Sequence, residues 1–312
     1  MPRIPSRLVF IWFGDHFPFS SVLAVRSAVR QCRPAETLVL HRGLSPSSTG
    51  VAEIKAEPSV RLVEAGSEWF ENLPERCGGL GELFQCLEDP AARANLLRLA
   101  VLYQLGGIYL DLDTLTLRDL RPLRRYPAFC GLERLTKPVG VAQAPTPAQL
   151  LLVQARQKVR GWCARRGDGA ALFRTVERLY PTAANNAVLG AAPHNPAIGT
   201  ALRLIAEMTD AQRRLRFAMG THLLQRVTQN RSQPDIEVLE PGYFYPLGPR
   251  ISTHWFWPGS ASRVATLVRP NTHVIHWYAS SKREHAEAIT SQYVHQRRHD
   301  VAFAALASPY AE

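Results

Sequence analysis

The stretch from Asn95 to Asp113, NLLRLAVLYQLGGIYLDLD, constrains the fold of this chain more than any other. Its Leu and Val positions give a helix one broad apolar face. The Gly106–Gly107 pair is expected to end that helix, because glycine accepts the positive φ of a C-terminal cap. The next residues alternate as in a half-buried strand, which turns Tyr109, Asp111 and Asp113 to one side.

Two carboxylates two residues apart at the end of such a strand form a hard-oxygen site. It suits Mg²⁺ or Mn²⁺, with the remaining coordination positions taken by phosphate oxygens and water. Asn95 and Arg98 are three residues apart on the preceding helix, so both side chains can project the same way. The sequence therefore predicts a site for a metal–diphosphate complex at Asp111 and Asp113, with Arg98 within reach.

The beginning of the chain predicts the sheet that carries this site. Strand-like runs at 7–13, 37–41 and 60–64, with a helix at 20–31 between the first two, indicate an α/β fold with a mostly parallel sheet. Such sheets bind ligands beyond the carboxyl ends of their strands. Trp12, at the end of the first strand, is expected to line that crevice, with burial in the core as the alternative.

Composition is typical of a globular protein, because 46% of the 312 residues are hydrophobic and 20% are charged. The net charge of +11 favours an anionic partner such as a nucleotide, a phosphorylated lipid or an acidic membrane, although a solvated Arg-rich surface explains it equally well. The five cysteines include no CxxC pair, which argues against a disulfide framework or a zinc site and favours a reducing cytosol. No apolar run reaches the roughly 20 residues of a membrane span, and the N-terminus is not a secretory signal.

The remainder of the chain is less regular and is expected to complete a single domain over residues 1–312. A basic helical insertion is predicted at about 145–182; its outer face could lie on a membrane surface, but a solvated face is favoured. Further expectations are short strands at 128–132 and 139–142, a turn into a strand at 185–190, a last strand at 272–278 and one peripheral C-terminal helix at about 282–312.

The central stretch resembles the signature of glycosyltransferases with a DXD sugar-binding region. That group includes yeast-type initiating α-mannosyltransferases, lactosylceramide α-galactosyltransferases and, more distantly, the clostridial glucosylating toxins. Three other segments are similar to the family's motifs: IPSRLVFIWFG at the start, NNAVLGAAPHNP, and HVIHWYASSK near the end. The resemblance covers residues 4–113, 185–196 and 273–282, and it implies a GT-A type α/β fold and a retaining, metal-dependent transferase.

The resemblance also implies roles by position. The nucleotide and donor sugar would contact Ile11, Trp12, Phe13, Asn95, Arg98, Gly107, Tyr109 and Asp111. Catalysis would involve Asp111, Arg98 and Asn186, with Asn185 as the alternative to the last. Asp113, Asp111 and His276 would hold Mn²⁺ or Mg²⁺, and His273 competes with His276. The implied donor is a UDP-hexose or UDP-N-acetylhexosamine, with GDP-mannose less favoured.

Some positions depart from the family pattern. Asn95 stands where the clostridial toxins carry an Asp that holds the transferred sugar, so the donor sugar is expected to differ. The family's first-strand His is Val9 here, or Phe10 in a shifted register. Ser281 replaces a Trp that covers the donor, a place that Trp277 could take.

Other functions fit the sequence less well. A phosphatase of the haloacid-dehalogenase type also uses Asp-x-Asp, but Leu115 occupies its Thr/Val position and no later Gly-Asp-x-x-x-Asp occurs. A nucleic-acid binder is disfavoured because no binding motif is present and the basic residues are scattered. A sugar-binding relative without turnover stays open. The acceptor is expected to be a small molecule, a glycan or a lipid-linked compound, in a bacterial cytoplasm or at the inner membrane face.

Overall fold

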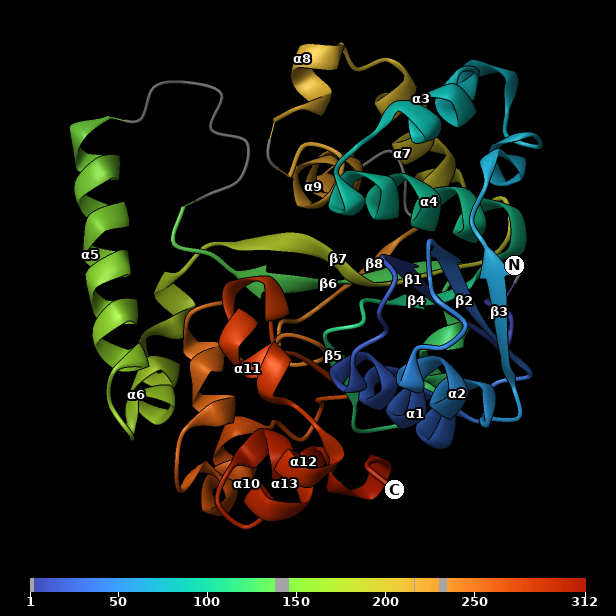
Figure 1. Cartoon of the computed structure of the whole chain (residues 1–312). Helices are drawn as coiled ribbons and strands as arrows, with labels where there is room; N and C mark the ends of the chain where they lie inside the picture. Colours follow the sequence, from blue (N-terminus) through green and yellow to red (C-terminus); the bar gives the residue numbers. More distant parts are fainter. Residues whose placement is uncertain (1–2, 138–145, 216, 230–234) are drawn as a thin grey trace.

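The computed structural model describes residues 3–137, 146–215, 217–229 and 235–312. A seven-stranded sheet runs through the molecule in the order β3-β2-β1-β4-β7-β6-β8 (Figure 1). Its strands are β1 (Arg7–Phe13), β2 (Glu36–Arg42), β3 (Val60–Glu64), β4 (Gly107–Leu110), β6 (Ala128–Arg134), β7 (Thr182–Ala191) and β8 (Glu237–Leu239). Only β7 runs antiparallel to its neighbours in this sheet, so the predicted α/β class with a mostly parallel sheet is confirmed.

Helices cover both faces of the sheet. In the view of Figure 1, α3 (Leu80–Cys86), α4 (Pro90–Leu105), α7 (Pro196–Ala206) and α9 (Thr221–Gln229) lie above it, and α1 (Phe19–Cys32) and α2 (Thr49–Lys55) lie below it. The alternation of β1 and β4 supplies both layers: Val9 and Tyr109 pack toward α4, whereas Phe10 and Ile108 pack toward α1. This is the two-residue periodicity that the sequence predicted.

The order of the strands creates a crevice beside β1. On one side of β1 lie β2 and then β3. The next strand along the chain, β4, pairs with the other side of β1. Ligands of open α/β sheets bind where the strand order reverses in this way, outside the carboxyl ends of the strands. Trp12 and Asp111 are therefore brought to the same edge.

Local chemistry sets the limits of α4, the helix that leads into β4. The Asp89 carboxylate accepts hydrogen bonds from the N–H groups of Ala91 and Ala92, both at 3.2 Å, and Pro90 takes the first helical position, where its missing N–H costs nothing. The helix ends at Gly106, whose φ is +63°. A Cβ there would lie 2.7 Å from Pro193 Cδ, so glycine is required by the close approach as well as by the backbone.

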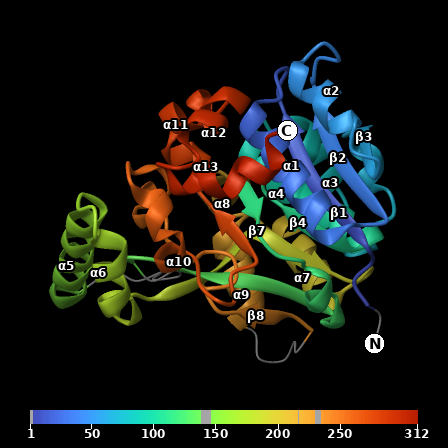
Figure 2. The same cartoon turned by 90° about the horizontal axis from the view of Figure 1, so that it is seen from below.

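The insertion between β6 and β7 is helical in its described part. It consists of α5 (Pro147–Ala164) and α6 (Gly169–Val176), which stand away from the sheet (Figures 1 and 2). The strand expected at 139–142 lies outside the described residues.

The segment at 185–190 differs from its prediction. Asn185 and Asn186 belong to the ten-residue strand β7 and not to a turn. A register shift against β6 between Cys130 and Gly131 moves the pairing from Leu189 to Asn185. This irregularity lets one strand bend at a pair of polar residues, which a single sequence does not distinguish from a turn.

The C-terminal part also differs from its prediction. Short helices α8 (Asp210–Arg213) and α10 (Val264–Leu267) precede it, and β9 (Val274–His276) pairs with β5 (Thr114–Thr116) in a separate two-stranded sheet. The tail then forms α11 (Arg283–Ala288), α12 (Ser291–Arg297) and α13 (Ala302–Ala307) instead of one peripheral helix. Phe303 in α13 is buried against Phe256 and Trp277, and the Arg30 guanidinium in α1 donates to the Pro309 carbonyl, so the tail is part of the core (Figure 2).

Within the described residues, none of the helices combines the length and the apolar content that crossing a bilayer requires.

Candidate active site

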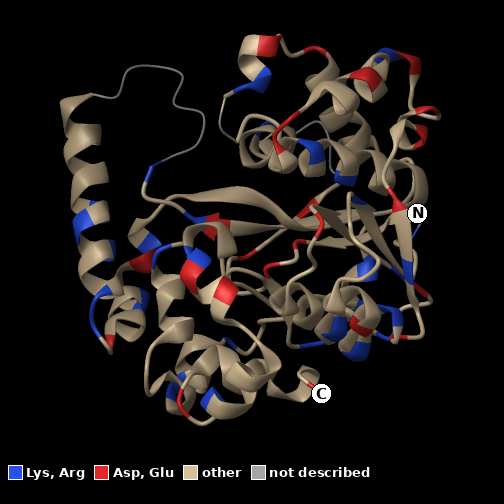
Figure 3. Ribbon diagram, viewed as in Figure 1, with Lys and Arg blue, Asp and Glu red and all other residues tan. Residues whose placement is uncertain are grey.

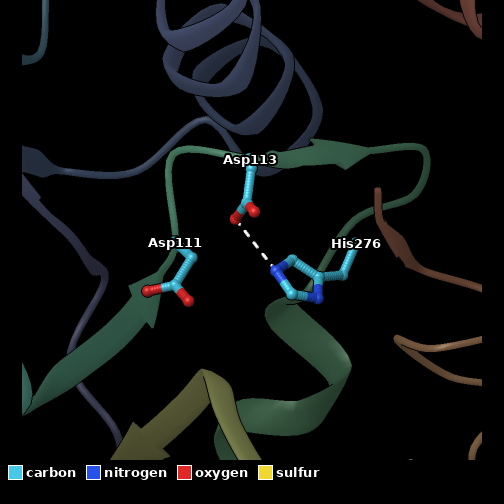
Figure 4. A group of neighbouring side chains, drawn as sticks. All are labelled: Asp111, Asp113 and His276. Carbon is cyan, nitrogen blue, oxygen red and sulfur yellow. Dashed lines mark hydrogen bonds and ion pairs between the residues drawn. The ribbon is translucent and has the colours of Figure 1, made fainter. Parts of the chain in front are cut away.

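Two carboxylates and an imidazole converge beside the end of β4. Asp111 follows β4, Asp113 precedes β5, and His276 is the last residue of β9. Because Thr114 pairs with His276 across the β5–β9 ladder, the imidazole is held next to Asp113. One ligand atom from each of the three side chains lies within 4.8 Å of the other two, and the three groups point toward one another (Figure 4).

Hydrogen bonds fix the Asp113 carboxylate on both of its oxygens. The His276 Nε2 lies 2.9 Å from Oδ1, and the Ala279 N–H donates to Oδ2 at 2.8 Å. Burial opposes ionisation of Asp113, but the imidazole and the N–H group outweigh it, so the pKa of Asp113 lies below its ordinary value. Burial likewise opposes protonation of His276, yet the attraction of Asp113 prevails and raises the pKa of His276.

Asp111 is held differently. Burial raises the pKa of Asp111, although the Arg98 guanidinium counteracts it. Arg98 Nη1 lies 3.2 Å from Asp111 Oδ1, and the Tyr109 hydroxyl donates to the same oxygen at 2.5 Å. The two carboxylates therefore have different protein partners, although one oxygen of each lies within 4.8 Å of the other and of a His276 ring nitrogen.

Arg98 is almost fully buried, with 5% of its surface exposed. Its guanidinium lies 4.2 Å from the centre of the Tyr109 ring and donates to the Asn186 carbonyl at 2.6 Å. The Asn186 Nδ2 donates in turn to Asn95 Oδ1 at 2.8 Å. The buried Arg98 guanidinium thus connects α4 to the bend in β7. It also holds a positive charge next to the carboxylate of Asp111.

The end of β1 lies along the same edge. Trp12 and Phe13 are half-buried, and the Trp12 Nε1 has no hydrogen-bond partner within the described part of the chain. The Trp12 ring packs edge-on against Phe17, with ring centroids 5.6 Å apart. Ile11 is buried in the core layer that also contains Tyr109, so it supports the site from behind.

Four residues considered from the sequence lie away from the site: Gly107, which was assigned to it, and three that were alternatives. Gly107 opens β4 at the end opposite to Asp111 and packs on the Arg7 carbonyl, so it does not line the site. Trp277 is buried at 1% exposure and cannot cover a donor. His273 hydrogen-bonds the Asp119 carbonyl at 2.8 Å and stacks on Tyr243, which leaves His276 as the imidazole of the cluster.

The fourth of these residues is Asn185, which faces the protein interior. Its Oδ1 accepts from the Ala187 N–H at 2.8 Å, and it also contacts Glu133, so it faces the interior. Asn186 is the residue of the pair that faces Asn95. The aromatic run from Tyr243 to Trp257 is largely interior as well, since Phe244, Tyr245 and Trp255 are buried.

Three polar residues beside the cluster have no role that could be predicted from the sequence: Glu133, Tyr278 and Lys282. Glu133 is buried, accepts from the Tyr278 hydroxyl at 3.0 Å, and has its pKa raised by burial. Lys282, whose Nζ donates to the Pro249 carbonyl at 3.0 Å, has its pKa lowered to about 8 by burial, although Asp113 counteracts this. The signal available for Glu133 was an acidic residue in the otherwise apolar run AFCGLER. For Tyr278 and Lys282, the only signal in the sequence was their position within the segment HVIHWYASSK.

A cavity of about 840 Å³ opens beside the site. Asp111, Asp113 and His276 do not line it, but Asn95, which bonds Asn186, and Ser280, which follows the Ala279 N–H that binds Asp113, do. Its walls come from the start of α4 and from the segment around α8, and they include the apolar Leu87 and Met219 and the basic Arg213.

The donor set fits a divalent cation. Two carboxylates with one imidazole suit Mn²⁺ and tolerate Mg²⁺. The His276 Nδ1 is buried without a hydrogen-bond partner among the described residues, and the ring is held by its Nε2 contact with Asp113 and by the rings of Tyr245 and Tyr278.

Comparison with known proteins agrees with this arrangement. Residues 18–129, which include α4 and both aspartates, match the family model "Glycosyltransferase sugar-binding region containing DXD motif". The predicted family resemblance is confirmed. Its outer motifs, at 4–14, 185–196 and 273–282, all lie outside the matched segment.

Two curated relatives are similar over a short part of the chain. "Mannosyl phosphorylinositol ceramide synthase CSH1" of Saccharomyces cerevisiae is 43% identical over 61 residues, which is 20% of this chain and 15% of the relative. "Inositol phosphoceramide mannosyltransferase 3" of Schizosaccharomyces pombe is 48% identical over 50 residues, which is 16% of this chain and 13% of the relative. The similarity therefore spans only a small fraction of these relatives' length.

Solved glycosyltransferase structures resemble the chain over most of its length at low identity. Mouse xyloside xylosyltransferase 1 has a TM-score of 0.46 and 13% identity, with coverage of 86% of this chain and 96% of that chain. Because this score is below 0.5, the assignment of the site rests on the sheet order and the side-chain geometry.

Proposed function

We propose that this protein is a metal-dependent, retaining glycosyltransferase that moves a sugar from a nucleoside-diphosphate sugar to a hydroxyl acceptor. The observation that carries the proposal is the convergence of Asp111, Asp113 and His276 beside Arg98. The preferred donors are UDP-hexoses or UDP-N-acetylhexosamines. GDP-mannose is the competing donor, because the two yeast relatives are named for mannosyl transfer.

We assign Asp113, Asp111 and His276 to the cation, Mn²⁺ or Mg²⁺. A cation there would act as a Lewis acid that offsets the negative charge of the departing diphosphate. In this role Asp113 suits direct coordination because its low pKa keeps it anionic. Asp111 is better suited to share its oxygens between the cation and the donor, since Tyr109 and Arg98 already bind one of them.

The positive groups around the cluster would stabilise the charge that develops on the diphosphate. The Arg98 guanidinium is already oriented by the Asn186 carbonyl, so it need not reorganise during the reaction. Lys282 supplies a second cation whose charge depends on pH. Trp12 and Phe13 offer aromatic surface and an unpaired indole N–H to the base.

Asn95 and Asn186 form the end of the site that would hold the transferred sugar. Their paired amides offer donors and acceptors to sugar hydroxyls, and no negative charge. We assign the acceptor to the cavity that opens beside Asn95, and we propose that its hydroxyl approaches the sugar from the side of the leaving group. In that geometry a phosphate oxygen of the donor can take the acceptor's proton while the anomeric bond breaks, which retains configuration.

The test is nucleotide release from UDP-glucose, UDP-galactose, UDP-GlcNAc and GDP-mannose in the presence of Mn²⁺. One donor is expected to be hydrolysed or transferred and to raise the melting temperature. Asp113→Asn keeps the shape of the side chain and should lower turnover by about a thousandfold, because the cation supplies several kcal/mol of stabilisation. Asp119→Asn is the matched control, since Asp119 lies outside the cluster and pairs with Arg121.

Three results would contradict the proposal. Phosphate release from simple phosphomonoesters without nucleotide release would favour the phosphatase alternative. Donor binding that requires Asp113 but leads to no turnover with any acceptor would favour the non-catalytic relative. Equal activity of Asp113→Asn and Asp119→Asn would remove the cluster from the mechanism.

A further inference from the structure

The outer face of α5 carries a row of exposed apolar side chains. Leu151, Leu152, Ala155, Val159 and Trp162 recur at spacings of three and four residues, so they lie on one face of the helix. The exposed fractions are 66% for Leu151, 50% for Leu152, 41% for Val159 and 48% for Trp162. With a rise of about 1.5 Å per residue, the row extends over roughly 16 Å.

The opposite face of α5 is the one that packs on the molecule. Gly161 and Cys163 are buried, and the Arg156 carbonyl accepts from the Tyr180 hydroxyl at 2.8 Å. The helix is thus anchored by its inner face, and the apolar row is exposed to solvent. Figure 1 shows α5 at the edge of the molecule.

A row of this kind is unusual on a protein surface. Single exposed apolar residues are common and need no explanation, whereas contiguous ones mark a surface that is covered by something else. Most of the large apolar side chains that are exposed in the described residues lie on α5; the others are Leu179, Leu215 and Phe217.

The charge around the row is predominantly positive, although Asp168, just beyond α5, pairs with Arg166 at 3.0 Å. Between Glu133 and Asp168 the sequence has no Asp or Glu. Its Lys and Arg residues are Arg134, Lys137, Arg156, Lys158, Arg160, Arg165 and Arg166. Figure 3 shows basic and no acidic positions along α5. Lys158, Arg165 and Arg166 are exposed on or beside the apolar row.

We propose that α5 docks this protein on an anionic lipid surface, with the helix lying in the plane of the membrane. A face of Leu, Val and Trp flanked by Lys and Arg is the composition of interfacial helices. The apolar side chains enter the boundary of the acyl chains, and the basic ones meet the lipid phosphates. A second copy of this chain is a poorer partner, because pairing two α5 helices would bring their unbalanced cations together.

The proposal is independent of the enzymatic activity, so vesicle sedimentation tests it directly. The full chain is mixed with vesicles of phosphatidylcholine alone, or of equal parts of phosphatidylcholine and phosphatidylglycerol. It is expected to sediment with the anionic vesicles and to be released by added NaCl, because salt screens the attraction to the lipid phosphates.

Leu151→Glu places a carboxylate at the N-terminal end of the row, on its most exposed leucine, and should lower the partition coefficient on the order of tenfold. Leu179→Glu makes the same change at a leucine that is 67% exposed but lies outside α5, and it should bind like the wild type. Lys158→Glu leaves the apolar row intact and should reduce the preference for anionic vesicles. Thermal unfolding and circular dichroism verify that each variant is folded.

The proposal is overturned if the wild type does not sediment with anionic vesicles, or if it sediments equally with neutral ones. Equal binding by Leu151→Glu and the wild type would also overturn it, since the lipid contact would then lie elsewhere. Light scattering in the absence of lipid tests whether a second copy of the chain covers the row. A dimer that Leu151→Glu dissociates would assign the row to that second copy and overturn the proposal.

Discussion

The two segments that form the carboxylate–histidine cluster reach it in different ways. Asp111 and Asp113 are delivered by a helix, a glycine cap and a strand that follow one another directly along the chain. His276 comes from the other end of the sequence and is positioned by the pairing of β9 with β5. Local patterning therefore determines the first segment, whereas the second depends on contacts between residues far apart in the sequence.

The two segments also differ in the contacts that stabilise them. The α4–β4 segment is buried between two helical layers, and its polar groups are linked to one another by the Arg98 and Tyr109 contacts. The segment that carries His276 is short, and it rests on the C-terminal helices through Trp277 and Phe303. We therefore expect the C-terminal tail to matter for the site even though none of its residues from α12 onward reaches the cluster.

The largest expected effect tests that dependence. Phe303→Ala removes a ring that is 1% exposed and stacks on Phe256 with centroids 5.1 Å apart, so it should destabilise the protein by about 3–5 kcal/mol. Urea unfolding measures the change. Gln296→Ala on the exposed side of α12 is the control and should stay close to the wild type. A loss no larger than the control's would show that the tail is peripheral after all.

The second prediction separates the two histidines of the C-terminal segment. His276→Ala should weaken Mn²⁺ binding by about a hundredfold, because it removes one of three groups in the cluster. His273→Ala, which loses only a carbonyl contact and a stacked ring, should leave Mn²⁺ binding nearly unchanged. Calorimetric titration with Mn²⁺ in the presence of a nucleoside diphosphate gives both affinities, and the reverse order would move the site to His273.

The third prediction concerns the N-terminal segment. Asn95→Asp keeps an oxygen for the Asn186 amide but adds a negative charge where the donor sugar is proposed to lie. It should change the ratio of kcat/KM between two donor sugars by about tenfold, because hydrogen bonds to substrate hydroxyls discriminate strongly. Affinity for the free nucleoside diphosphate is the internal control. If all donors change equally, Asn95 does not select the sugar.

The smallest expected effect is a pH dependence of donor kcat/KM that arises from Lys282, in the C-terminal segment. Burial lowers the pKa of Lys282 to about 8, so the side chain is a cation below that pH and neutral above it. Donor kcat/KM should therefore fall a few-fold as the pH rises through 8, since the diphosphate loses a positive partner. Lys282→Arg keeps its charge over this range and should flatten the profile. An unchanged profile in that variant would assign the titration to another group.

Sequence reasoning predicted most of the regular structure. The helix start at Asp89, the glycine cap and the alternation of β4 are local features, and each follows from backbone sterics and side-chain periodicity. The helical character of the 146–180 insertion likewise followed from its pattern. Wrong or incomplete predictions arose where a residue's partner is distant: the Asn185–Asn186 turn, the peripheral tail and the assignment of Gly107.

The choice between alternatives that the sequence left open shows the same limit. His273 and His276 are equivalent by pattern, since both lie in the short run before Trp277. Only the β5–β9 pairing turns one imidazole toward Asp113 and the other toward Asp119. The roles of these residues in catalysis stay predictions until the variants are measured.

The sequence by itself determined that a helix, a glycine turn and a strand would present Asp111 and Asp113 together at a sheet edge, because that information is contained within one local stretch. The tertiary structure decided which imidazole, which asparagine and which lysine join them. Those residues lie more than seventy positions after Asp113 in the sequence, and their orientation depends on strand pairing and core packing, which no local pattern records.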